Sequence, residues 1–251
     1  RGGTGMNSLS RIYALANNTF REAIRNKLLY MLLGFSVVMI SSGVVLATLS
    51  YVEVHEILQD MGLAAIRFFS VGIAIFVGIG LIHNEVDRRT IFTILSKPVS
   101  RNEFLVGKWA GLTFTVWLLL ALMAGAFAIV SLLAGAPLGL DHLVAIVLIG
   151  LELMVVVAIA TFFSSFTTPM LAALFSVGPW MIGHLSRDLH ALGQQSEVGT
   201  VTTMANFVFL LMPDFEVFNK TLEAVHGLPI DSGEIGLAFV YAVGYTVCTL
   251  I

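Results

Sequence analysis

Long apolar runs separated by short polar stretches dominate the pattern along the chain. Six runs have about the twenty residues that an α-helix needs to cross the ~30 Å hydrocarbon core of a bilayer. They predict membrane-spanning helices over about 28–50, 64–82, 108–134, 142–163, 170–186 and 234–251. The fifth run contains Gly178-Pro179, which predicts a kink because proline removes a backbone donor. The pattern predicts an all-α integral membrane protein with six transmembrane helices.

The stretch before the first run predicts an amphipathic helix over 8–27. Apolar residues recur at three- and four-residue spacing, opposite a basic and polar face, and they are Leu9, Ile12, Tyr13, Ala16, Phe20, Ala23 and Ile24. This arrangement is typical of a helix that lies in the headgroup plane of a membrane. A cytosolic helix packed on a partner is the alternative.

The segment 187–233, between the fifth and sixth runs, is the longest polar interruption. Within it, "TMANFVFLLMPDFEVFNKT" carries an apolar run too short to span a bilayer, ended by Pro213. We expect a re-entrant or interfacial hairpin on the outer face, with an ordinary loop as the alternative.

Composition agrees with a membrane protein and gives no sign of a metal site. The 251 residues are 57% hydrophobic and 12% charged, against roughly 25% charged residues in soluble domains. The single cysteine, Cys248, excludes an internal disulfide, and the six scattered histidines do not have metal-ligand spacing. Residues 1–5 precede Met6 and are interpreted as an expression scar, which leaves 6–251 as one transmembrane domain. No secretory signal follows Met6.

Lysine and arginine predict the orientation. If the N-terminus is cytoplasmic, the inner segments hold nine of these residues and the outer side holds only Arg67, Arg187 and Lys220. The acidic residues lean toward the outer side. We therefore expect a multi-pass protein of the cytoplasmic membrane with both termini inside.

The segment 83–107, between the second and third runs, is charged and contains clear signals for where helices end and begin. "HNEVDRRTIFTILS" predicts a short amphipathic helix, which Pro98 ends because a proline disfavours helix in the residue before it. Ser100 and Glu103 then have the spacing of a capping box, so the next helix should begin at Ser100 and continue into the third span. The segment predicts a rigid elbow that a cytosolic partner can push; a solvated basic hairpin that only enforces topology is the alternative.

Three stretches resemble the permease subunits of ABC-2 type exporters: "NEVDRRTIFTILSKPVSRNEFLVGKWAG", "LANNTFREAIRNKLLY" and "FFSSFTTPMLAALFSVGPWMIG". The resemblance implies a type V exporter fold, two permease copies and two separate ATP-binding subunits. It also implies that the segment between spans two and three is a coupling helix and that 8–27 is the connecting helix. The coupling contacts would then be Glu85, Asp87, Arg88, Arg89, Ile91, Phe92, Leu95 and Ser96, with Ser165 and Thr167 in a second, smaller cytoplasmic turn.

No phosphate-binding loop of the form GxxxxGK[ST] occurs in the chain. The chain therefore has no catalytic motif for ATP hydrolysis, and ATP and Mg²⁺ are expected in a partner subunit. No nucleic-acid partner is expected.

Glu152 is the one carboxylate predicted inside a span, and no basic partner for it is visible in the sequence. A charge at that depth costs several kcal/mol unless it faces a cavity or a partner. It either lines a translocation path or anchors the packing of neighbouring helices. Gly107-x-x-x-Gly111 is a further packing signal, because small residues at this spacing let helices approach closely.

The sequence bears on three function classes. An ATP-driven exporter permease agrees with the six runs, the charged elbow and the missing phosphate loop, and the apolar spans favour a hydrophobic or amphipathic cargo. A secondary transporter or channel would show internal repeats and paired intramembrane charges, neither of which is seen. A membrane-embedded lipid-modifying enzyme would need a cluster of His, Asp or Glu at the interface.

Overall fold

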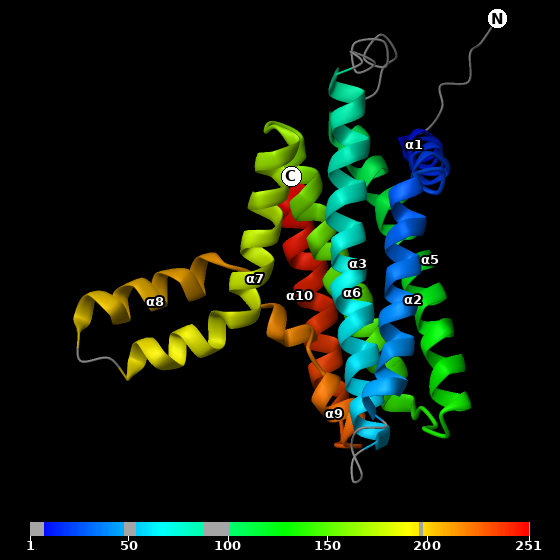
Figure 1. Ribbon diagram of the computed structural model, residues 1–251. Coiled ribbons are helices and arrows are strands. Elements are labelled where there is room, and N and C mark those ends of the chain that lie inside the picture. The colour runs from blue at the N-terminus through cyan, green and yellow to red at the C-terminus, as the bar shows by residue number, and fades with distance from the viewer. Residues whose placement is uncertain (1–7, 48–53, 88–100, 196–197, 251) are drawn as a thin grey trace, which may run out of the picture.

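The computed structural model describes residues 8–47, 54–87, 101–195 and 198–250, and their regular structure is entirely helical (Figure 1). Five helices in these ranges are long and apolar enough to cross a membrane. They are α2 (Lys27–Ala47), α3 (Val54–Asp87), α5 (Arg101–Leu133), α6 (Leu140–Ser164) and α10 (Ser232–Leu250). The protein is therefore a multi-pass membrane protein.

The fifth predicted span, 170–186, corresponds to α7 (Pro169–Gln194), which is not among these five helices. Two prolines and His184 dilute its apolar composition. By length and apolar composition alone, the described residues give a sixth candidate when the bent pair Gly199–Leu210 and Phe215–Val225, whose two parts meet at 52°, is counted as one span.

The helix α3 is longer than the predicted second span, 64–82, at both ends. It runs without a break to Asp87, so Glu85 and Asp87 belong to the same helix as the span. The prediction that a separate short helix starts at residue 83 is therefore wrong. Nothing in 83–87 is a proline or glycine that would end the helix. Residues 88–100, which carry the other predicted elbow features, Arg88 to Ser96, Pro98 and Ser100, lie outside the described residues.

The core is centred on α6, which contacts α3, α5, α7 and α10. Its stretch from Leu148 to Thr161 is buried except for Met154. A helix that is apolar all round is expected at the centre of a bundle, because every face then has a neighbour. Glu152 lies in the middle of this stretch and is 0% exposed.

The N-terminal helix α1 (Ser8–Ala23) packs across the beginning of α5. Gly107 and Gly111 make this possible, because a Cβ on Gly111 would lie 2.5 Å from the Ala16 carbonyl oxygen and one on Gly107 would lie 2.8 Å from the Leu15 Cβ. The small-residue pair predicted from sequence thus acts within one chain. On the rest of α1, Leu9 is 80% exposed and Tyr13 is 73% exposed.

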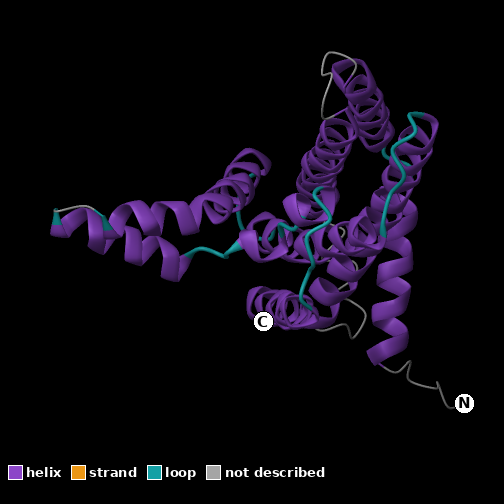
Figure 2. Cartoon of the chain, turned by 90° about the horizontal axis from the view of Figure 1, so that it is seen from below, coloured by secondary structure: helices purple, strands orange, loops and turns teal. Residues whose placement is uncertain are grey.

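After descending along the bundle, α7 turns away from it, and with α8 (Gly199–Leu211) it forms a hairpin that projects sideways (Figures 1 and 2). Gln194 donates a hydrogen bond to Asn206 across this hairpin, at 2.9 Å. The chain then returns to the bundle through the 3₁₀-helix η1 (Phe215–Phe218) and the short helix α9 (Thr221–Val225). This return brings polar residues of the segment 187–233 against the centre of the fold.

Candidate functional site

Glu152 has three polar partners, each from a different residue. Its Oε1 accepts one hydrogen bond from Trp180 Nε1, at 2.7 Å, and lies 3.0 Å from His184 Nε2. Its Oε2 lies 3.3 Å from Arg67 Nε in an ion pair. Among the described residues Oε2 accepts no hydrogen bond, so Glu152 is held by the hydrogen bonds to Oε1 and by its ion pair with Arg67. A fully buried carboxylate is tolerated in an apolar core when its charge is paired in this way.

Arg67 is the basic partner that the sequence analysis did not find. We expected Arg67 on the outer side, and this placement is wrong: α3 begins at Val54, which puts Arg67 about 20 Å along the helix. Besides Glu152, its guanidinium donates to Asn219 Oδ1 at 2.6 Å and to the Phe218 carbonyl at 3.3 Å. A prediction that α3 begins as early as Val54 would have placed Arg67 inside the span. The polar residues in 54–60 made that early start hard to predict from hydropathy.

His184 extends the network from Glu152 to η1. Its Nδ1 lies 3.0 Å from Glu216 Oε1, and Asn219 Nδ2 donates to both oxygens of the same Glu216, at 3.3 and 3.2 Å. Asn219 also accepts from Arg67, so the contacts close into a ring. The ring joins α3, α6, α7 and η1, elements that are far apart in sequence.

The sequence of α7 explains why the ring forms there. Trp180 and His184 are four residues apart, which places both on one face of the helix toward Glu152. Gly183 lies between them, and a Cβ at Gly183 would overlap the Pro213 carbonyl and the Phe215 ring. The missing side chain lets η1 approach closely enough for Glu216 to reach His184.

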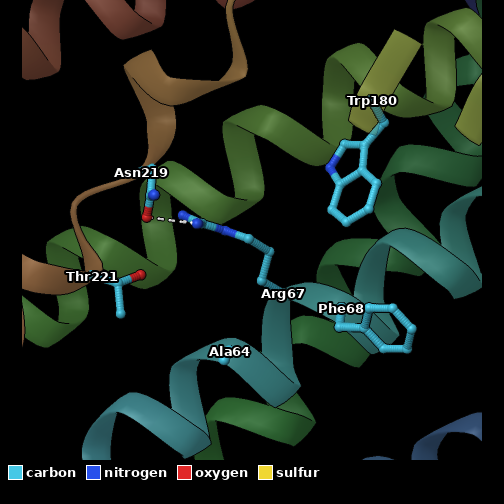
Figure 3. Close-up of a pocket in the computed structure, with 6 residues that line it drawn as sticks. All are labelled: Ala64, Arg67, Phe68, Trp180, Asn219 and Thr221. Carbon is cyan, nitrogen blue, oxygen red and sulfur yellow. Dashed lines mark hydrogen bonds between the residues drawn. The ribbon is translucent and has the colours of Figure 1, made fainter. Parts of the chain in front are cut away.

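A cavity of about 410 Å³ opens beside the ring (Figure 3). Its lining residues are Ala64, Arg67 and Phe68 of α3, Trp180 of α7, Asn219, which directly follows η1, and Thr221 of α9. Figure 3 shows Arg67 reaching from α3 to Asn219, with Phe68 and Trp180 on the other side of the guanidinium stem. The cavity therefore has apolar walls and one cationic group.

A second cluster of charges joins α1 to the start of α5, directly after the segment 88–100. Arg11 donates to Glu103 Oε1 at 3.0 Å, and Lys108 Nζ lies 3.9 Å from Glu22 Oε2. Lys108 is 1% exposed, so its charge is held inside this interface. Glu103, predicted to form a capping box with Ser100, contacts α1 through Arg11. Ser100 lies outside the described residues, so the capping box stays a prediction.

The predicted second contact, the turn after α6, is described. The Ser165 hydroxyl donates to the Phe162 carbonyl at 2.7 Å and that of Thr167 to the Phe163 carbonyl at 2.6 Å. Both hydroxyls therefore stabilise the helix end. In Figure 1 this turn lies at the same end of the bundle as α1 and the end of α10.

The family profile described as ABC-2 family transporter protein matches residues 13–251. The chain belongs to the ABC-2 transporter family. It is the permease, the membrane subunit of an ABC transporter, and such subunits have no ATPase activity of their own. Comparison with curated proteins gives no match.

Membership decides among the function classes compared above. The paired intramembrane charges of Arg67 and Glu152 would by themselves have agreed with a secondary transporter. The profile, which matches residues 13–251 of the given sequence, assigns the chain to the ABC transporters instead. Within the described residues, no group of three or more His, Cys, Asp or Glu is arranged to hold a metal ion.

Proposed function

We propose that the permease is the transmembrane half of an ATP-driven exporter, in which two permease copies pair with two ATP-binding subunits. ABC-2 permeases generally pair with such subunits. The observation that carries the proposal is the packed and charged interface between α1 and α5, which adjoins the segment 88–100.

This interface supports a mechanical role because it makes α1 and the start of α5 one body. Gly107 and Gly111 bring the two backbones together, and the Arg11–Glu103 and Lys108–Glu22 pairs fix their relative position. A push on 88–100 enters α5 at its first turn, and a continuous 33-residue helix transmits displacement that a loop would absorb. We propose that the partner binds Glu85 to Ser96, with the Ser165–Thr167 turn as its second contact.

The proposed topology has six crossings and both termini in the cytoplasm, with the bent α7 as the fifth crossing. The basic residues Arg11, Arg21 and Arg25 of the α1 region support this, since cytoplasmic segments are rich in lysine and arginine. The exposed Leu9 and Tyr13 support a position of α1 in the headgroup plane. The hairpin of α7 and α8 would then lie in the outer half of the membrane.

In this mechanism the buried ring around Glu152 keeps α3, α6, α7 and η1 together while the bundle moves. Ion pairs and hydrogen bonds at bilayer depth resist separation, because water does not replace them. The ring thus favours rotation of whole permease copies over sliding of single helices.

Co-purification tests the proposal. The permease, expressed from its native host with an affinity tag, should retain an ATPase that contains a phosphate-binding loop, in a two-to-two ratio. Reversal of charge by Arg88→Glu and Arg89→Glu should lower the retained ATPase at least about tenfold, whereas Arg187→Glu, which belongs to the opposite side, should not. Absence of an ATPase, or equal retention by all variants, would contradict the proposal.

A further inference from the structure

We propose that the cavity beside the buried ring binds an anionic amphiphile, with the acidic headgroup on Arg67 and the alkyl chain between Phe68 and Trp180. This inference rests on the proposed function, because it names the class of molecule that the exporter would hold. Anionic single-chain amphiphiles and anionic phospholipids share this chemistry, and the experiment below separates them.

The size and the lining of the cavity suit an alkyl chain with a small headgroup. Its volume of about 410 Å³ lies toward the lower end of the ~300–1,000 Å³ typical of ligand pockets. Ala64, Phe68 and Trp180 supply apolar walls, and two aromatic rings give a chain flat surfaces to contact. Arg67, Asn219 and Thr221 supply the polar groups.

The charge facing the cavity is positive. Arg67 is the only ionisable residue of the lining, and its guanidinium has five N–H groups. Nε faces Glu152 as an ion pair without a hydrogen bond, whereas Nη1 donates to Asn219 and Nη2 donates to the Phe218 carbonyl. Each of these two Nη atoms therefore keeps one N–H without a hydrogen-bond partner among the described residues. Two N–H groups of one guanidinium match the oxygens of a carboxylate or a phosphate.

The neighbouring carboxylates do not cancel this preference. Glu152 is turned to Trp180, His184 and the Nε of Arg67, and Glu216 is turned to His184 and Asn219. Neither carboxylate belongs to the lining. The Thr221 hydroxyl, which has no partner within the described part of the chain, can donate a further hydrogen bond to an acidic headgroup.

The ligand class follows from these two properties together. A headgroup that cannot accept hydrogen bonds, such as trimethylammonium, would leave the two N–H groups unmet and place a second cation beside Arg67. A soluble anion without a chain would leave the apolar walls against water. An acidic head joined to an alkyl chain satisfies both, and the low dielectric at this depth strengthens the charge interaction.

Photoaffinity mapping tests the site in the full-length permease reconstituted in phosphatidylcholine nanodiscs. The probe is dodecanoic acid with a diazirine on its chain, and the comparison probe carries trimethylammonium in place of the carboxylate. We expect saturable labelling of the peptides that contain Ala64–Phe68 and Thr221 by the acid, at least about tenfold above that by the cation. Addition of phosphatidylglycerol to the nanodisc separates the sources, because it suppresses labelling if the site prefers an anionic phospholipid.

Ala64→Phe is the decisive variant, because it fills the cavity from a residue that makes none of the ring's polar contacts. Ala128→Phe, which replaces another exposed alanine, this one on α5, is its matched control. Labelling should fall about tenfold in the first variant and stay within twofold in the second. Equal labelling by acid and cation, or unchanged labelling in Ala64→Phe, would overturn the proposal. Loss of the ATPase partner alone would not change labelling, so the two proposals fail separately.

Discussion

Replacement of Glu152 by glutamine is the sharpest perturbation of the buried ring. The amide keeps the shape of the side chain and can still accept from Trp180, but it removes the negative charge 3.3 Å from Arg67. Two unit charges at that distance attract by about 5 kcal/mol at an effective dielectric constant of 20. The relief of desolvation at Glu152 reduces the net effect, whereas the cation left buried adds to it, and breaking such pairs costs about 3–5 kcal/mol.

We therefore expect Glu152→Gln to lower the free energy of unfolding by about 3–5 kcal/mol, measured by denaturant titration in mixed detergent micelles. Glu234→Gln is the matched control, since Glu234 pairs with Lys220 at 2.7 Å but is 52% exposed. Exposed pairs contribute about 0.2–1 kcal/mol, so this variant should stay within that range. Equal, small losses in both variants would refute the reasoning that the ring holds the helices together.

Two glycine substitutions test close approaches, each with a control in the same helix. Gly111→Ala should cost about 1–3 kcal/mol of stability and weaken retention of the ATPase, because its Cβ would lie 2.5 Å from a carbonyl of α1. Gly125→Ala, with nothing within 4 Å, should be neutral or up to about 1 kcal/mol more stable; equal effects in both would contradict the packing. Gly183→Ala should push Pro213 and η1 away from α7, because the new Cβ would overlap the Pro213 carbonyl and the Phe215 ring, and should increase protease cleavage within residues 212–220. Gly178→Ala, also without neighbours within 4 Å, should not, and cleavage that rises in both variants would argue against a specific contact.

The spans were predictable because their signal is local. Five of the six apolar runs correspond to helices that are long and apolar enough to cross a membrane, and the centre of each helix lies within its run. The family was visible from the charged stretch after the second span. Boundaries were less accurate, since α3 continues at each end through residues that hydropathy alone treats as loop.

The buried ring could not be predicted from one sequence. Arg67 and Glu152 are 85 residues apart, and nothing local in either stretch indicates the other. His184 looked like a scattered histidine until the return of η1 brought Glu216 beside it. Such contacts depend on which faces the helices turn to one another, which hydropathy does not encode.

The central claim is that a separate ATPase drives this permease from the end that carries α1 and the Ser165–Thr167 turn. Site-specific photocrosslinking tests it directly, with p-benzoylphenylalanine placed at Phe92, Thr167 or Leu133, the last being 83% exposed at the other end of α5. Adducts identified by mass spectrometry should contain a phosphate-loop ATPase at positions 92 and 167 and none at 133. ATPase adducts at 133, or none at 92 and 167, would contradict the account.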